Sequence, residues 1–306
     1  MLATIAICTL NRAESLRRTL DSLVALRLPK DLRWEVVVVN NGCTDHTDEV
    51  VASYALRLPI RGECEPQRGL SRARNRAVDA AKGKYIIWTD DDIVVDPGWL
   101  TAYIEAFRRW PEAAVFGGPI IPRYESPVAE WLPACEHLLG HVYAARDFGA
   151  SPIPLSMGGR REPFGANFAV RVMEQRRFRY NPTLGMAPGQ KRLAEESAVI
   201  AGILAAGSSG YGIPDARVEH CIGRQRQTTD YIAHYFAARG ETVALFRKER
   251  ETGPLLFGVP RWMWRRAAES WVRYHLSRLI NPSPVWMSHL KAYGFAKGQF
   301  RYWWNR

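Results

Sequence analysis

At 306 residues, 47% of them hydrophobic, the chain is long enough for one large domain with a tail, or for two domains, and should bury a core of ordinary size. Its five cysteines are odd in number and include no CxxC pair, and no apolar run reaches the roughly 18–20 residues that span a bilayer, so the composition argues against a disulfide framework, a zinc site and a membrane-spanning helix. The net charge of +11 indicates polyanionic partners, namely phosphates, nucleic acid or an anionic membrane.

Strand and helix patterns alternate through the first 118 residues. The chain opens on a short apolar strand at residues 3–9 rather than on a signal peptide. Asn11 followed by Glu14 has the spacing of a capping box for the next helix. Further strands are expected at 34–39, 58–64, 85–89 and 114–118, and helices at 44–54, 71–81 and 99–107. Such repeated strand–helix–strand units with short links predict an α/β fold with a mostly parallel, doubly wound sheet.

The strand expected at residues 85–89 leads into three consecutive aspartates, Asp90, Asp91 and Asp92. In α/β proteins the carboxyl ends of the strands are where ligands bind. Three adjacent anions repel one another, and a bound divalent cation would offset that repulsion. Oxygen ligands select Mg²⁺ or Mn²⁺, which usually bind together with a substrate's phosphates. The alternative is a solvated acidic turn, with Asp96 capping a helix that begins at Pro97.

The pattern becomes less regular after residue 118, where prolines interrupt it repeatedly. A helix is expected within residues 128–146, and a loop at 158–167 leads into a strand. A helix at 193–206 is opened by Glu195 and Glu196, and another helix is expected at 228–239.

The last 52 residues differ from the rest in composition. Residues 255–306 contain nine Lys or Arg against one acid, Glu269, and six of the eleven tryptophans. Tryptophan mixed with basic residues suits a membrane interface, where the indole lies at headgroup level and arginine meets anionic lipid. Two alternatives are a helical tail that packs its aromatic residues on the main domain, and stacking on single-stranded nucleic acid.

Seven motifs, taken in order, resemble the family 2 glycosyltransferases with a GT-A fold. The resemblance covers roughly residues 3–245, and it is specific because seven weak signals occur in the family's order. The motifs lie at residues 8–12, 38–45, 67–75, 90–92, 165–167, 195–196 and 218–220. The resemblance implies a nucleotide-diphosphate sugar as donor and inversion at the sugar carbon.

The resemblance also implies a metal site. Asp92, with help from Asp90, would hold Mn²⁺ or Mg²⁺, and the ion would neutralise charge on the leaving diphosphate. His220 would be a third ligand or a diphosphate contact. Asp90 or Asp91 would also face the donor's ribose or sugar.

Donor recognition falls, by the same resemblance, to the ends of the first strands. Thr9 and Arg12 stand where the family contacts base and phosphate. Asn40 replaces an aspartate that usually pairs with uracil; its amide still offers a donor and an acceptor. A UDP-sugar is therefore the first expectation, while thymidine and guanosine donors remain open. Four arginines are candidate phosphate contacts: Arg72 and Arg74 from a helix N-terminus, and Arg224 and Arg226 after the histidine.

An inverting transfer needs a base that takes the proton of the acceptor hydroxyl. Glu196 aligns with the family's base and is preferred over Glu195; adjacent helical residues point about 100° apart, so only one should face the acceptor. The alternative is that both acids simply oppose the helix dipole. The acceptor is expected near Gly165, Ala166 and Asn167.

These assignments divide the chain into three parts. Residues 1–118 would form the nucleotide-sugar half, 119–250 the acceptor-binding and catalytic half, and 251–306 a basic aromatic helical tail. The cysteine usage suits a reducing cytosol. The expected location is the cytoplasmic face of a membrane, with a lipid-linked or surface-polysaccharide glycan as acceptor and no nucleic acid partner.

Two other functions remain to be separated from this one. A sugar-phosphate nucleotidyltransferase would need a glycine-rich phosphate loop directly after the first strand, and residues 8–12 contain no glycine. A non-catalytic membrane adaptor on the same fold would not need the acidic triplet, the glutamate pair and the histidine together.

Overall fold

The computed structural model describes residues 2–251 and 253–305. The chain divides into two compact units. The first consists of Met1–Arg123, Ala144–Pro188 and Ala194–Cys221, and the second of Tyr124–Tyr143, Gly189–Leu193 and Ile222–Arg306. These units do not follow the three segments expected from the sequence, whose functional assignment stays a prediction.

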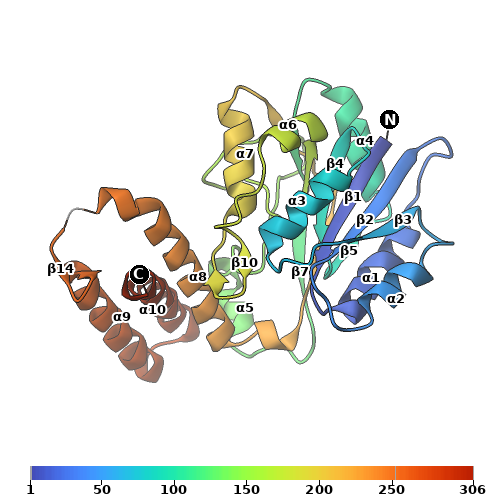
Figure 1. Cartoon of the computed structure of the whole chain (residues 1–306). Coiled ribbons are helices and arrows are strands. Elements are labelled where there is room, and N and C mark those ends of the chain that lie inside the picture. The colour runs from blue at the N-terminus through green and yellow to red at the C-terminus, as the bar shows by residue number, and fades with distance from the viewer. Residues whose placement is uncertain (1, 252, 306) are drawn as a thin grey trace. The chain divides into compact units, whose positions relative to one another are not determined.

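The first unit is built on an eight-stranded sheet with the order β3-β2-β1-β4-β9-β6-β12-β8 (Figure 1). Its strands are β1 (Leu2–Thr9), β2 (Arg33–Asn40), β3 (Ile60–Cys64), β4 (Tyr85–Asp90), β6 (Val115–Gly117), β8 (Ile153–Pro154), β9 (Asn167–Arg171) and β12 (Gly210–Gly212). Strands β3, β2, β1 and β4 run parallel, as do β6 and β12. Strand β9 runs antiparallel to both β4 and β6, and β8 is an antiparallel edge. The predicted α/β class with a mostly parallel sheet is confirmed.

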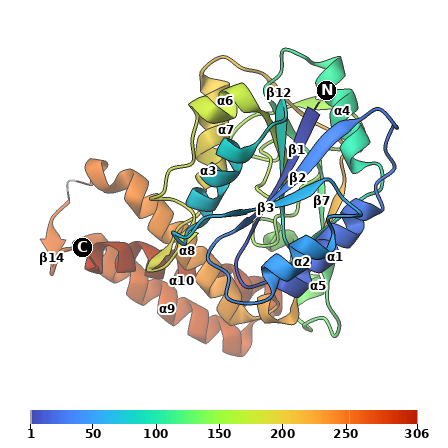
Figure 2. The same ribbon diagram turned by 45° about the vertical axis from the view of Figure 1, so that its right-hand side comes forward.

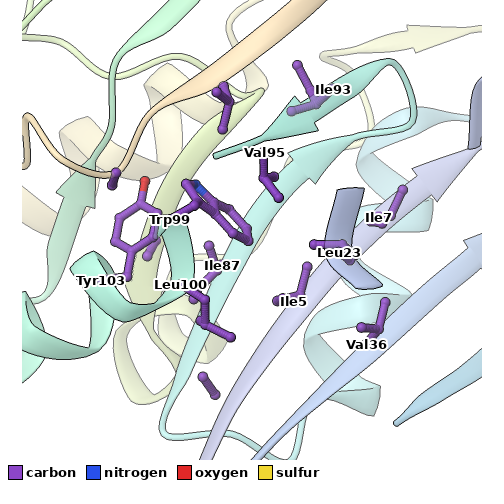
Figure 3. Close-up of a cluster of buried hydrophobic side chains, with 14 of the residues drawn as sticks. Ile5, Ile7, Leu23, Val36, Ile87, Ile93, Val95, Trp99, Leu100 and Tyr103 are labelled. Carbon is purple, nitrogen blue, oxygen red and sulfur yellow. The ribbon is translucent and has the colours of Figure 1, made fainter. Parts of the chain in front are cut away.

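Both faces of this sheet are covered by helices, which is why its strands read as continuous apolar runs. Along β1, Ile5 and Ile7 pack on one side, against α1 and α4, while Ala6 between them packs on the other side against α3. Figure 3 shows the first of these cores, with Trp99, Leu100 and the strand residues around them. The helices of this unit are α1 (Ala13–Val24), α2 (Thr47–Ser53), α3 (Leu70–Ala80), α4 (Trp99–Arg109), α6 (Val172–Arg177) and α7 (Glu195–Ala205).

A smaller three-stranded sheet follows the acidic triplet. It contains β5 (Ile93–Val95), β13 (Val218–Ile222) and β7 (Ile120–Tyr124), in the order β5-β13-β7. Antiparallel pairing of β13 with β5 places His220 opposite Ile93. The histidine motif is thereby brought beside the triplet, although about 130 residues separate them in the chain. A short hairpin of β10 (Met186–Ala187) and β11 (Gln190–Lys191) precedes α7.

The second unit is mainly helical. Its elements are α5 (Leu132–Cys135), η1 (Glu136–Leu138), η2 (Arg224–Arg226), α8 (Thr229–Arg247), η3 (Lys248–Arg250), β14 (Leu255–Leu256), β15 (Val259–Pro260), α9 (Arg261–Ile280) and α10 (Ser283–Trp304). Helix α10 packs along both α8 and α9 (Figure 2). Glycines permit the close approach to α8, since a Cβ at Gly298 would lie 1.9 Å from the carbonyl oxygen of Ala237. The expectation of a helical tail is confirmed.

Three local predictions fail. Arg12, not Asn11, is the N-cap of α1, and Asn11 has a left-handed backbone with a φ of 52°. The Asn11 Oδ1 instead accepts a hydrogen bond from Thr44 N at 2.7 Å, which ties two strand-end loops together. The helix expected within 128–146 is reduced to the single turns α5 and η1. Helix α8 runs eight residues further than expected, to Arg247.

No helix within residues 2–251 and 253–305 is both long enough and apolar enough to cross a membrane.

Candidate active site

The candidate site lies at the carboxyl ends of β1, β2 and β4. Strand register aligns Thr9 with Asn40 and Cys8 with Asp90, so these ends form one edge of the sheet. Asp91 and Asp92 continue from that edge into the turn before β5. The parallel part of the sheet therefore gathers motifs from residues 9, 40 and 90 into one place.

Arg12 offsets the mutual repulsion of the aspartates from within the chain. Its Nη1 lies 2.7 Å from Asp91 Oδ1 and its Nη2 2.8 Å from Asp92 Oδ2. Thr9 Oγ1 donates a hydrogen bond of 2.7 Å to the other Asp91 oxygen. Asp91 is 3% exposed, and burial raises its pKa to about 7 against the opposing effect of Arg12. Arg12 and Thr9, predicted to contact the donor, thus act directly on the triplet, a partnership that sequence spacing did not indicate.

Asp92 and His220 form the part of the site suited to a metal ion. Asp92 Oδ2 lies 3.5 Å from His220 Nε2, and both residues are about 95% buried. Asp90 is not part of this pair; its Oδ1 lies 3.8 Å from Arg74 Nη2. Within the described part of the chain no three His, Cys, Asp or Glu residues are grouped to hold a metal. One carboxylate and one imidazole fit an ion that takes its remaining ligands from a substrate diphosphate and water. The metal role of Asp90 stays a prediction.

Arg74 is the centre of a second charged cluster. Its guanidinium lies 3.2 Å from Glu195 Oε1 and 3.8 Å from both Glu196 Oε2 and Asp90 Oδ1. Only 4% of the residue is exposed, and the indole of Trp88 and the phenol ring of Tyr180 lie 5.8 and 5.4 Å from it. The sequence suggested that Arg74 reaches the donor phosphates. In the structure it pairs with the two glutamates that open α7 instead.

The two glutamates differ in environment. Glu195 is 5% exposed, and burial together with the charge of Glu196 raises its pKa to about 8, with Arg74 acting in the opposite sense. The Glu196 side chain is 17% exposed. Gly165 borders it closely, since a Cβ on Gly165 would lie 3.2 Å from Glu196 Oε1 and 2.7 Å from Arg74 Nη2. Only glycine lets this loop approach the carboxylate.

Asn167 has no access to an acceptor, in contrast to the expectation. It is fully buried; its amide nitrogen donates to the carbonyls of Pro119 and Ala216, and its oxygen accepts from Trp99 and Tyr103. These four bonds fix the start of β9. Ala166 is 3% exposed, which leaves Gly165 as the residue of this motif beside the glutamates.

The side-chain amides of the turn after β2 also form hydrogen bonds within the chain. Asn40 Oδ1 accepts from Cys43 N at 2.6 Å, and its Nδ2 donates to Asp48 at 2.9 Å, so both ends needed for nucleobase pairing are engaged. The neighbouring Asn41, which the sequence did not single out, accepts from Gly69 N and donates to the carbonyls of Glu65 and Gln67. The two asparagines hold the turn and the start of α3 together.

The other three arginines predicted to contact the donor phosphates are Arg72, Arg224 and Arg226. Arg72 is exposed on the first turn of α3, next to Gly69, whose φ is 149°. Arg224 and Arg226 belong to η2 of the second unit. Their contact with a donor stays a prediction.

Comparison with known sequences gives a family and several relatives. The profile of the family described as glycosyl transferase family 2 matches residues 4–168. The succinoglycan biosynthesis protein ExoM of Rhizobium meliloti is 26% identical over 256 residues, which is 81% of this chain and 76% of the relative.

Solved structures with the same fold include a mannosyltransferase from Pyrobaculum calidifontis in complex with GDP-Man and Mn²⁺. It has a TM-score of 0.64 and 17% identity, and the match covers 99% of this chain and 87% of the other. TarS 1–349 of S. aureus in complex with UDP-GlcNAc has a TM-score of 0.57 and 14% identity, with 98% and 92% covered. At these identities the likeness establishes the fold.

Proposed function

This chain belongs to glycosyl transferase family 2, with the GT-A fold, and we propose that it moves a sugar from a nucleotide-diphosphate donor to a hydroxyl of a glycan, inverting the sugar carbon. One observation carries the proposal: two charged clusters meet at Asp90 on a single sheet edge. One cluster has the Asp92–His220 pair suited to a metal, and the other has the partly exposed Glu196 suited to a base.

Donor binding is assigned to the first cluster. Asp92 and His220 would hold Mn²⁺ or Mg²⁺, which when bound neutralises charge on the departing diphosphate. Support comes from the fold neighbours that carry GDP-Man with Mn²⁺ or UDP-GlcNAc. A UDP-sugar remains the first choice of donor. Since the Asn40 amide is engaged in its turn, discrimination of the base would have to come from other groups.

We assign to Glu196 the role of the base that takes the proton of the acceptor hydroxyl. Its carboxylate is the more exposed of the pair, and Gly165 lies beside it without a side chain that would cover it. Arg74, whose guanidinium lies 3.8 Å from this carboxylate, would orient it. A carboxylate held in this way can accept the proton as the new bond forms.

The acceptor is proposed to be a growing polysaccharide or a lipid-linked glycan at the cytoplasmic face of a membrane. Two observations support this. The relative from Rhizobium meliloti takes part in succinoglycan biosynthesis by its name, and the last 52 residues combine most of the net charge with six tryptophans.

Donor hydrolysis and nucleotide binding test the proposal. We expect Mn²⁺-dependent release of a nucleoside diphosphate from a donor sugar, and a thermal-shift screen of UDP, GDP, dTDP and CDP with Mn²⁺ to identify the base. Asp92→Asn should abolish transfer and remove the Mn²⁺-dependent part of nucleotide affinity measured by calorimetry. Asp31→Asn, at an exposed aspartate before β2, serves as the control. Unchanged Mn²⁺-dependent binding in Asp92→Asn, or release of inorganic diphosphate from a nucleoside triphosphate, would overturn the assignment.

A further inference from the structure

The carboxyl-terminal half of α9 presents four aliphatic side chains to solvent. Val272, Leu276, Leu279 and Ile280 are 44, 57, 81 and 81% exposed. Their spacing of four, seven and eight residues from the first places them on one side of the helix, about 100° wide. We call these four residues the α9 stripe. Single exposed apolar residues are ordinary, whereas a continuous stripe marks a contact surface.

Packing within the second unit does not account for the stripe. The inner side of α9 is formed by Met263, Tyr274 and Ser277, which are buried, and Tyr274 stacks on Tyr293 of α10 with ring centroids 5.8 Å apart. The tryptophans of the tail likewise include some that pack inside the second unit and some that are exposed. Trp264 packs edge-on against Phe300 and Trp304. The packing alternative from the sequence therefore explains part of the aromatic content, and the stripe lies outside it.

Cationic groups of α9 lie near the stripe. Arg265, Arg273 and Arg278 of α9 are all exposed, and Trp271 at its margin is 50% exposed. The one acid in residues 255–306, Glu269, already pairs with Arg265 at 3.3 Å. With Glu269 paired to Arg265, Arg273 and Arg278 leave a net positive charge near the aliphatic centre.

We propose that the α9 stripe is a membrane-docking surface that lies on an anionic lipid bilayer. The aliphatic side chains would enter the boundary between headgroups and acyl chains, and the arginines would meet lipid phosphates. A bilayer fits better than an acidic protein because the four central residues offer no hydrogen-bonding group, while the indole and guanidinium groups at the margin are those that suit headgroup level. The inference rests on the proposed function in one respect, that docking would bring the enzyme to a lipid-linked acceptor.

Flotation of the full-length protein with vesicles tests the proposal. We expect binding to vesicles of phosphatidylcholine with 30% phosphatidylglycerol at low salt, and weak binding to phosphatidylcholine alone. The double variant Leu279→Glu/Ile280→Glu should bind at least tenfold more weakly, because two charges would have to enter the interface. Both side chains are 81% exposed, so the fold should tolerate the change. Leu56→Glu, at a fully exposed residue of the first unit, is the matched control and should float like the parent.

A second pair of variants separates charge from apolar insertion. Arg273→Glu/Arg278→Glu should reduce binding to the anionic vesicles and also reduce its dependence on salt. The proposal is overturned if the double glutamate variant of the stripe floats like the parent. It is also overturned if that variant changes only the oligomeric state, measured by light scattering, since the stripe would then contact another copy. Flotation does not require transfer, and donor hydrolysis is assayed without vesicles, so failure of one leaves the other intact.

Discussion

At the scale of single residues, the site is organised by two arginines whose roles were only partly visible in the sequence. Arg12 bridges Asp91 and Asp92, and Arg74 joins Asp90 to the glutamates. The motifs placed the right residue types on the right loops. They could not show that each arginine would contact carboxylates rather than phosphate, because the aspartates are about 80 residues from Arg12 and the glutamates more than 100 residues from Arg74 in the chain.

The first prediction at this scale concerns the base. Glu196→Gln keeps the shape of the side chain and removes its ability to accept a proton. The chemical step should slow by roughly 10²–10⁴-fold, while the affinity for the nucleotide, measured by calorimetry, stays within about twofold, on the order of 0.4 kcal/mol. Glu195→Gln is the natural comparison. An inactive Glu195→Gln beside an active Glu196→Gln would move the base by one residue.

The second concerns the pH dependence of stability. Because burial raises the pKa of Glu195 to about 8, the folded chain keeps this proton between about pH 5 and 7.5, where the unfolded chain has lost it. The folded state then binds more protons, so this group makes the free energy of unfolding decrease as pH rises, by up to about 1.4 kcal/mol per pH unit. In Glu195→Gln that contribution should be absent.

Urea unfolding at pH 5.5, 6.5 and 7.5 measures the effect as the difference in slope between parent and variant. Glu105→Gln, at an exposed glutamate of α4, controls for the loss of one acid. Parallel slopes for the parent and Glu195→Gln would mean that Arg74 keeps the carboxylate ionised in the fold.

At the scale of elements, the sequence predicted most of the first unit and less of the second. Strands such as β2 and β4 are continuous β-branched or apolar runs between turn residues, and these local signals place them to within about two residues, the usual uncertainty of element boundaries. The order of the sheet beyond β4, with β9 inserted antiparallel, depends on contacts distant in sequence. The proline-rich segment before β9 gave a weaker pattern, and the helix expected within residues 128–146 is only two single turns.

The contact between α8 and α10 gives a prediction at this scale. A Cβ at Gly298 would lie 1.9 Å from the carbonyl oxygen of Ala237, a fixed backbone atom, so Gly298→Ala must push the two helices apart. We expect a loss of about 1–3 kcal/mol in the free energy of unfolding of the second unit. Ala292→Ser, at an exposed residue of the same helix, should change it by less than about 0.5 kcal/mol. A neutral Gly298→Ala would show that the helices separate without loss.

At the scale of the whole chain, the acidic site and the surplus of basic residues lie in different units. The acidic residues of the candidate site lie in the first unit, while residues 255–306 contribute the surplus of basic residues and form about half of a helical second unit. Composition alone indicated this asymmetry. It could not show that the tail is also structural, because that follows from the packing of α10 on α8.

Removing the tail should therefore unfold more than the tail itself. In a chain ending at Gly253, the α8 side chains Ile232 and Phe236, now 0 and 6% exposed, would lose the cover of the α10 residues Met287 and Leu290 with which they form one core cluster. Burial of such side chains contributes about 1.5–3 kcal/mol each. We expect α8 to become sensitive to limited proteolysis in the shortened chain, while a fragment containing the first unit resists. The Leu279→Glu/Ile280→Glu variant should show the parent's protease pattern, because its changed residues lie on the exposed side of α9. If α8 stays protected in the shortened chain, then α10 covers α8 without stabilising it. The tail would in that case contribute mainly to the surface of the molecule.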